Sequence, residues 1–204
     1  KEYQALSSKS KSLFYKHAIN FLKRRGINET DIKKYKLGFC DNGAYQNRII
    51  IPSYDDNGIL NYFVGRSFMG SGMKYKNPNV SRDIIPFDWF IAWSYPIVLC
   101  EGVFDAISIR TNAIPMLSKK PPKSLLRKVF EKKVKTIYIA LDEDAKKDAY
   151  RLSEFFKDFG IDSKVVNLPK DKDPNDLGFD KITDLIGKTI SSSFSDMIQA
   201  RLYG

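Results

Sequence analysis

Acidic residues recur at the ends of apolar runs in the C-terminal half of the chain. Glu101 closes IVLCE, Asp142 and Asp144 close TIYIALDED, and Asp173 follows VVNLP. Carboxylates that lie close together raise one another's pKa unless a cation lies between them. Mg²⁺ suits such a group because it takes oxygen ligands from carboxylates, water and substrate phosphates. These residues predict a metal site for phosphoryl chemistry, in which the metal activates an attacking hydroxyl and stabilises the leaving oxygen.

A structural role is the alternative for any one of these acids, since a carboxylate at a strand end can cap the next helix or lie in solvent. The three positions together favour metal binding, because groups at the carboxyl ends of parallel strands gather at one edge of the sheet. Asp142 and Asp144 are expected to project to the same side, since residues i and i+2 share a face of a strand.

The elements that position these acids alternate in type along the chain. The runs IVLCE, AIPML, TIYIALDED and SKVVNLP predict strands, and the segments between them predict helices. Strands that alternate with helices are typical of a parallel sheet with right-handed crossovers. We therefore expect a central parallel sheet flanked by helices over residues 96–178, followed by a short helical tail over residues 179–204.

The first 95 residues predict an α+β subdomain. Residues 12–25 carry apolar side chains at helical spacing, and Gly26 supplies the stop. Asn28 is a cap for a shorter second helix. Residues 47–54 and 59–68 predict two strands joined by a DDNG hairpin turn. The expected fold class is α/β, with this subdomain preceding the parallel sheet.

Positive charge is concentrated in the first half of a chain whose net charge is +10. Residues 1–83 hold 15 Lys+Arg against 7 Asp+Glu, whereas the remaining residues hold 19 against 17. This asymmetry predicts that the first half contacts a polyanion. A basic face that is merely solvated is the alternative.

Composition excludes a membrane-spanning helix and a tetrahedral zinc site. No stretch approaches the roughly 18 apolar residues that a membrane span needs, so we expect no membrane association. Cys40, Cys100 and His17 are too few for a tetrahedral zinc site, so no zinc is expected in this chain. Two isolated cysteines are typical of a reducing, cytoplasmic setting, and both are expected to be small core residues.

Several motifs resemble those of one enzyme family. EGVFD (101–105) and LDEDA (141–145) are similar to the Glu-Gly-x-x-Asp and Asp-x-Asp motifs of the Toprim domain. Ahead of them, residues 21–39, the hairpin of residues 47–68 and KYKNP (74–78) are similar, in order, to segments of DnaG-type primases, and KDPNDL (172–177) is similar to the closing element of the primase Toprim fold. The resemblance covers about residues 15–178. It implies a DnaG-type primase catalytic core, of bacterial or phage type, with a Toprim domain over residues 96–178.

The resemblance also implies residue roles. Glu101, Asp142 and Asp144 are expected to be catalytic and to bind Mg²⁺, for which Mn²⁺ can substitute, with Asp173 at a further metal position. Asp105 orders the loop after Glu101, and Asp176 supports the site. The nucleotide or template is expected to contact Arg48, Arg66, Lys74, Tyr75 and Asn77.

The implied function is the synthesis of short RNA primers on single-stranded DNA by nucleotidyl transfer from ribonucleoside triphosphates. The implied partners are a replicative helicase and a zinc-binding domain outside this chain, in the cytoplasm of a bacterial or phage-infected cell. Two alternatives remain open. A Toprim nuclease would use the same acids with water as the nucleophile, and a single-strand-binding module would keep the fold without catalysis.

The chain departs from the family pattern at three places. Ala145-Lys146-Lys147 replaces the usual x-Ala-Gly run after the second aspartate, and Leu117-Ser118-Lys119 replaces a Leu-Gly-Thr loop. Asn175 stands where a second acid often follows Asp173. These changes indicate a divergent branch and weaken the case for a third metal position.

Overall fold

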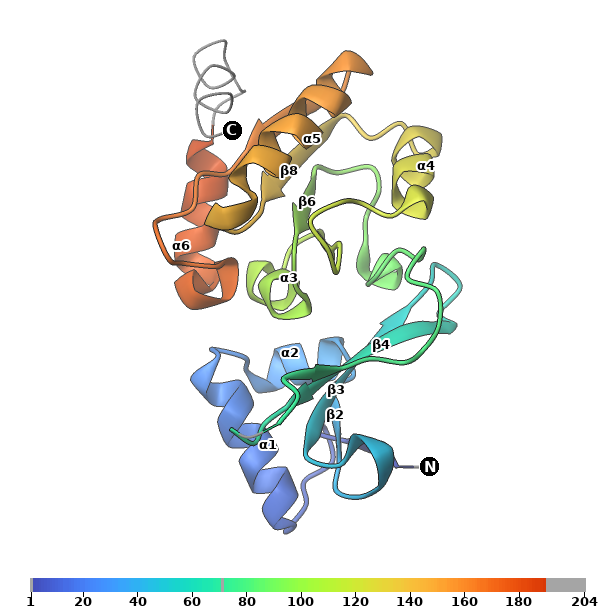
Figure 1. The fold of residues 1–204 in the computed structure, drawn as a ribbon, viewed down its shortest axis with the longest axis vertical. Helices are drawn as coiled ribbons and strands as arrows, with labels where there is room; N and C mark the ends of the chain where they lie inside the picture. The colour runs from blue at the N-terminus through green and yellow to red at the C-terminus, as the bar shows by residue number, and fades with distance from the viewer. Residues whose placement is uncertain (1, 71, 190–204) are drawn as a thin grey trace. The chain divides into compact units, whose positions relative to one another are not determined.

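The computed structural model describes residues 2–70 and 72–189, in two compact units, Lys1–Arg82 and Asp83–Gly204 (Figure 1). None of the helices in the described residues is long and apolar enough to cross a membrane. The residues Asp83 to Tyr95 pack with the second unit, whereas the sequence analysis had placed the boundary after residue 95.

The first unit is built on a five-stranded antiparallel sheet in the order β1-β2-β3-β4-β5. Its long central pair is the predicted hairpin, in which Asp55 accepts the backbone N–H groups of Asn57 and Ile59 and Gly58 has a φ of 77°. The three short strands were not predicted, because two or three residues carry no readable alternation. The strands are β1 (Gln4–Ala5), β2 (Gly38–Cys40), β3 (Arg48–Tyr54), β4 (Leu60–Ser67) and β5 (Tyr75–Lys76).

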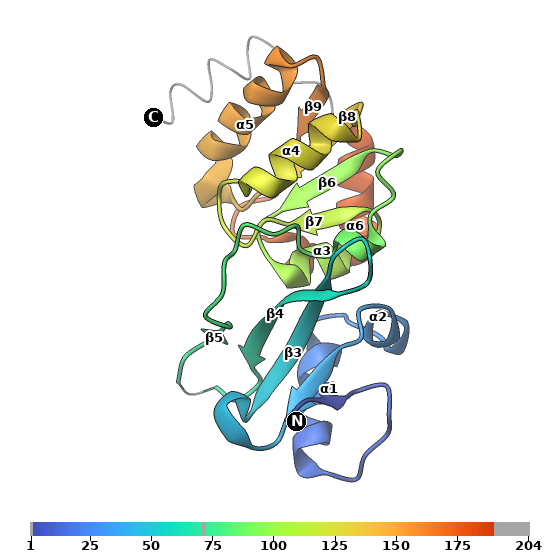
Figure 2. The same ribbon diagram turned by 90° about the vertical axis from the view of Figure 1, so that its right-hand side faces the viewer.

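Two helices cover one face of this sheet (Figure 2). They are α1 (Leu13–Arg24) and α2 (Glu29–Lys34), and a 3₁₀ turn, η1 (Gly43–Tyr45), precedes β3. Asn28 accepts the backbone N–H of Asp31, and Asp31 accepts that of Asn28, so the predicted cap is a full capping box. Helix α1 meets β2 through the edge-to-face pair of Tyr15 and Phe39.

The second unit contains the predicted parallel sheet, with the strand order β7-β6-β8-β9 and every neighbouring pair parallel. Helices α4 and α5 lie on one face of the sheet, and α3 and α6 lie on the other (Figure 2). The strands are β6 (Ile97–Cys100), β7 (Ala113–Pro115), β8 (Thr136–Ala140) and β9 (Asp162–Val165). The helices are α3 (Val103–Ile109), α4 (Lys123–Glu131), α5 (Lys146–Asp158) and α6 (Pro174–Lys188), with 3₁₀ turns η2 (Asp88–Phe90) and η3 (Glu143–Ala145).

The core of the second unit lies between the sheet and the pair α4 and α5. Alternate strand residues, such as Leu99 and Ile139, are fully buried there against Leu125 of α4 and Phe156 of α5. On the opposite face α3 and α6 are joined by a buried hydrogen bond from Asn175 Nδ2 to Ser108 Oγ, 2.7 Å long.

Helix α6 begins earlier than the predicted tail. It begins at Pro174 and is interrupted at Gly178, whose φ of 74° is in the left-handed region that favours glycine. Residues 179–188 continue the helix as expected. The rest of the predicted tail, residues 190–204 with its Ser-rich break, lies outside the described residues.

Candidate metal centre

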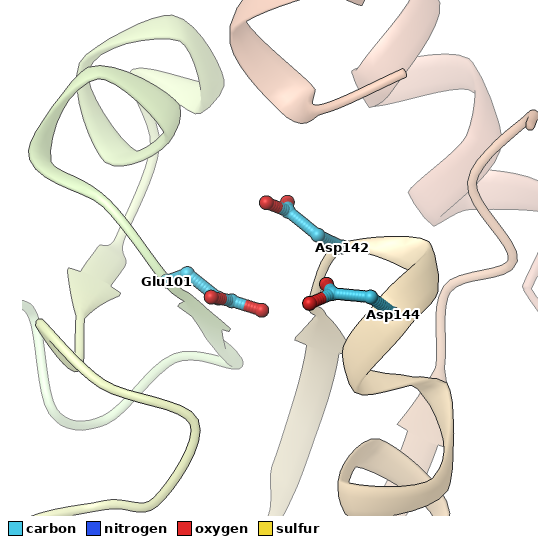
Figure 3. A group of neighbouring side chains, drawn as sticks. All are labelled: Glu101, Asp142 and Asp144. Atoms are coloured by element: carbon cyan, nitrogen blue, oxygen red, sulfur yellow. The ribbon is translucent and has the colours of Figure 1, made fainter. Parts of the chain in front are cut away.

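The strand order brings two of the acidic positions together. Strands β6 and β8 are neighbours, and their last residues, Cys100 and Ala140, lie opposite each other. Glu101 follows the first strand, and Asp142 and Asp144 follow the second. One carboxylate oxygen from each of the three lies within 4.8 Å of the others, and Figure 3 shows the side chains pointing toward one another. We call Glu101, Asp142 and Asp144 the acidic cluster.

The two aspartates converge by a different geometry from the one expected. Strand β8 ends at Ala140, so Asp142 and Asp144 do not share the face of a strand. Asp142 is the N-cap of the 3₁₀ turn η3, and its carbonyl accepts the N–H of Ala145. Asp144 lies within this turn, and its carboxylate still converges with those of Asp142 and Glu101.

The electrostatics of the cluster call for a cation. Burial is the main cause that raises the pKa of both Glu101 and Asp142, and the neighbouring carboxylates raise it further. Glu101 Oε1 and Asp142 Oδ1 are buried atoms without a hydrogen-bond partner among the described residues. Asp144 is exposed, and its Oδ2 lies 2.6 Å from the Nζ of Lys119.

The donor set fits a hard divalent cation. Three carboxylates offer oxygen ligands only, which suits Mg²⁺ or Mn²⁺ better than a metal that prefers sulfur or imidazole. A cation between Glu101 and Asp142 would also satisfy the two unpartnered buried oxygens. The three residues that could hold the ion are therefore those of the acidic cluster.

Asp105 lies under the loop that carries Glu101. Its Oδ2 accepts the N–H of Gly102 at 2.9 Å and caps α3. The side chain is buried, and burial, with the charges of Asp173 and Asp142, raises its pKa to about 7. A Cβ at Gly102 would lie 2.8 Å from Asp105 Oδ2, so any larger residue there would have to displace this carboxylate. Asp105 thus stabilises the loop that carries Glu101 through this hydrogen bond.

Asp173 lies near the acidic cluster but is not one of the three converging carboxylates in the part of the chain the structure describes. Its charge raises the pKa of Asp142 and Asp105. Its own Oδ1 accepts the N–H of Asp176 at 2.6 Å, so it is the N-cap of α6. Asp176 contributes this backbone group, and its side chain is exposed. The capping role, raised as the alternative for a single strand-end acid, is thus the one that Asp173 has in the structure.

The predicted basic residues occupy different environments in the first unit. Arg48 donates to the backbone carbonyls of Gly65 and Met73, at 3.3 and 2.8 Å, and so ties the β3–β4 region to the segment before β5. Arg66 lies over the rings of Phe21 and Tyr75, 5.7 and 4.7 Å from their centroids. Its Nε and Nη1 are buried without a hydrogen-bond partner among the described residues, and so is Asn77 Oδ1.

A pocket of about 520 Å³ gathers positive charge around Arg66. Burial and the neighbouring Arg25 lower the pKa of Arg66, although guanidinium remains charged at neutral pH. We name this the basic pocket, and its charged lining residues are Arg24, Arg25, Arg66 and Lys74, beside Phe21. The sequence analysis missed Arg24 and Arg25. The basic run KRR (23–25) at the end of α1 is the signal that could have found them.

Sequence similarity shows the family to which the chain belongs. Residues 98–178 match the Toprim-like family. The protein MG010 of Mycoplasma genitalium is 30% identical over 188 residues, which are 86% of this chain and 85% of that protein. The chain belongs to the MG010 family.

This MG010-family protein is also similar to DNA primases. A DNA primase of Clostridium acetobutylicum is 24% identical over 180 residues, which are 80% of this chain and 30% of the primase. The E. coli primase catalytic core superposes with a TM-score of 0.76 at 16% identity, covering 93% of this chain and 78% of that one. A DnaG primase catalytic domain bound to single-stranded DNA gives 0.75 at 16% identity, covering 89% and 74%. The fold is that of the DnaG primase catalytic core.

Within the MG010-family chain, the Toprim-like region contains every acid of the candidate site. Glu101, Asp105, Asp142, Asp144 and Asp173 all lie between residues 98 and 178. The basic pocket belongs to the first unit, outside the matched region.

Proposed function

We propose that the chain is a primase core that joins ribonucleotides on a single-stranded DNA template by divalent-metal-dependent nucleotidyl transfer. The observation that supports this most is the acidic cluster, three carboxylates within 4.8 Å at adjacent strand ends of a Toprim-like region. It lies in a chain with the fold of DnaG primase catalytic cores. The whole reaction is a proposal, because the chain spans 30% of the length of the Clostridium primase.

The acidic cluster would hold the divalent ion, Mg²⁺ with Mn²⁺ as a substitute. Such an ion, when bound, lowers the pKa of an attacking hydroxyl and neutralises phosphate charge. Glu101 and Asp142, which are half-buried and follow the ends of β6 and β8, would hold it from the side of the sheet. Asp144, which is exposed, would bind it from the solvent side, where a triphosphate can enter. Asp105 would keep the loop of Glu101 in place through its hydrogen bond with Gly102.

The basic pocket would bind the anionic backbone of a nucleotide or of the template strand. Arg24, Arg25 and Arg66 can each grip phosphate oxygens with two parallel hydrogen bonds, and Lys74 adds a mobile charge. Arg66 lines this pocket, and its Nε and Nη1 have no hydrogen-bond partner among the described residues. Tyr75 is 40% exposed beside Arg66, so its ring can stack on a base.

Two structural neighbours support part of the proposal about partners. One relative is bound to single-stranded DNA, and the Aquifex aeolicus primase structure contains both zinc-binding and RNA polymerase domains. We infer that single-stranded DNA and ribonucleoside triphosphates are the substrates. We infer also that a zinc-binding domain outside this chain and a replicative helicase assist it in the cytoplasm of a bacterial or phage-infected cell.

The decisive experiment measures RNA synthesis. The chain is incubated with single-stranded DNA, labelled ribonucleotides and Mg²⁺ or Mn²⁺, and the products are resolved by length. Asp142→Ala and Asp144→Ala should each lower synthesis by about a hundredfold or more, since a catalytic metal supplies several kcal/mol of transition-state stabilisation. Asp158→Ala, which removes an exposed acid at the end of α5, is the matched control and should retain activity.

Two other outcomes would replace the proposal. Metal-dependent shortening of the DNA, lost in Asp142→Ala, would indicate a nuclease. Binding to single-stranded DNA without any synthesis or cleavage, unchanged in Asp142→Ala, would indicate a non-catalytic binding module.

A further inference from the structure

The loop after β7 brings a cation to the acidic cluster. Met116 and Leu117 donate their N–H groups to the carbonyls of Cys100 and Glu101, at 2.8 and 2.9 Å. The loop is therefore tied to the end of β6, the strand that precedes Glu101. Leu117 has a φ of 58°, in the left-handed region that non-glycine residues rarely adopt. Such strain persists only where surrounding contacts fix the backbone, and here the hydrogen bonds of Met116 and Leu117 do so.

Lys119, two residues further on, reaches the acidic cluster. Its Nζ lies 2.6 Å from Asp144 Oδ2, and the two side chains are 45% and 72% exposed. Its charge also lowers the pKa of Glu101 and of Asp142, so it acts on all three carboxylates. The next residue, Lys120, has no side-chain contact with these acids in the described structure. Lys119 thus differs from an ordinary surface lysine.

A divalent ion bound by the acidic cluster would change the position of Lys119. An ammonium 2.6 Å from one ligand oxygen would be repelled by a dication held by the same three carboxylates. The contact with Asp144 is an exposed ion pair, which contributes little stability and is easily broken. The lysine stem is flexible and its ammonium is a mobile point charge. Lys119 can therefore leave Asp144 without disturbing the loop backbone.

We propose that Lys119 is a substrate-binding residue of the acidic cluster, held by Asp144 in the metal-free protein and moved to a phosphate oxygen of the nucleoside triphosphate when the carboxylates bind a divalent ion. This inference rests on the proposed nucleotidyl-transfer function. The triphosphate carries more negative charge than one divalent ion neutralises, so a cation beside the acidic cluster has a partner there.

Two binding measurements test the proposed role of Lys119. The lysine should weaken the binding of the divalent ion and strengthen the binding of the nucleotide. The first follows Mn²⁺ binding without nucleotide, by electron paramagnetic resonance, in the wild type, Lys119→Met, Lys119→Arg and Lys120→Met. Removal of the competing charge should tighten Mn²⁺ binding by about three- to tenfold in Lys119→Met. Lys119→Arg and the control Lys120→Met should stay near the wild type.

The second measurement follows the binding of a non-hydrolysable ribonucleoside triphosphate at saturating Mg²⁺, by calorimetry. Lys119→Met should bind it about tenfold more weakly, since a charge-assisted contact to phosphate is lost, whereas Lys119→Arg should recover most of the affinity. Opposite changes in metal and nucleotide affinity are a signature that a merely structural lysine would not produce. Thermal unfolding of each variant checks that folding is intact, as expected for an exposed side chain.

The outcomes separate this inference from the proposed function. If the wild type binds Mn²⁺ and makes RNA but Lys119→Met matches it in both affinities, the role of Lys119 is overturned and the primase proposal stands. If both affinities change in the same direction, the exchange of partners is overturned. If the wild type binds no Mn²⁺, both proposals fail.

Discussion

Asp105 has two roles in this site: it caps a helix, and its pKa is raised toward neutrality. Its carboxylate caps α3 through Gly102 and lies close enough to Asp142 and Asp173 to feel their charges. Burial raises the pKa of Asp105 from 3.8 to about 7. In the metal-free protein the group therefore changes charge near neutral pH, unlike an exposed aspartate.

This shift predicts a pH dependence of stability. Between pH 4 and 7 the folded protein keeps a proton on Asp105 that the unfolded chain has released. Asp105 therefore lowers the free energy of unfolding once the pH exceeds 3.8, the pKa of the unfolded chain. This destabilisation grows with pH and levels off above about 7, the pKa in the folded protein. Asp105→Asn stays neutral, so from pH 5 to pH 8 the wild type should lose about 2–3 kcal/mol more unfolding free energy than the variant.

Urea unfolding of both proteins at the two pH values, with a chelator present, measures this difference. The comparison cancels the titration of groups that do not interact with Asp105. Equal losses of stability in the wild type and Asp105→Asn would mean that Asp105 stays ionised in the folded protein.

At the scale of elements, a buried ion pair fixes the segment before β6 onto α4. Lys128 Nζ lies 2.5 Å from Asp88 Oδ2, and the two side chains are 12% and 5% exposed. Trp93 Nε1 donates to the other oxygen of Asp88 at 3.0 Å, and Lys128 lies over the Trp93 ring. Asn112 adds hydrogen bonds to the carbonyls of Ala92 and Pro96. These polar contacts explain why residues 83–95 pack with the second unit.

Removal of the lysine from this pair should destabilise the second unit. Lys128→Met leaves the buried Asp88 carboxylate without its cation, which should cost about 3 kcal/mol of unfolding free energy. The double variant Lys128→Met/Asp88→Asn should recover much of that loss, because Asn can still accept from Trp93. Urea denaturation measures all three proteins, with Lys132→Met, an exposed lysine at the end of α4, as the control. A loss below about 1 kcal/mol in Lys128→Met would show that the pair is not effectively buried.

At the scale of the whole molecule, the two units differ in charge. Residues 1–82 hold 15 Lys+Arg against 6 Asp+Glu, and the basic pocket gathers four of these cations, whereas the second unit gathers acids at one sheet edge. This division favours anion binding by the first unit and cation binding by the second.

Binding of single-stranded DNA should therefore depend steeply on salt, through counterion release. Arg24→Ala/Arg25→Ala removes two cations of the basic pocket, and it should flatten the slope of log affinity against log salt by about 1. Lys132→Ala/Lys135→Ala, on the exposed surface of the second unit, should leave the slope close to that of the wild type. Fluorescence anisotropy with a labelled oligonucleotide over a salt series measures both slopes. Equal slopes in the two double variants would remove the basic pocket from the DNA-binding surface.

The sequence by itself determined the elements and the positions of the acids along them. The long hairpin, the parallel strands, the helices between them and the cap at Asn28 all follow from periodicity and local hydrogen bonding, which short windows of sequence contain. It also placed Glu101 and Asp142 at strand ends, since an acid that closes an apolar run is visible in the sequence.

Only the tertiary structure decided which of these groups meet. The order β7-β6-β8-β9 places β6 beside β8, and this brings Glu101 to Asp142 and Asp144 across some forty residues of chain. The same packing places Lys119 beside Asp144. Side-chain contacts between distant segments depend on strand order and on the paths of the loops, and neither is encoded in the local pattern from which the elements were predicted.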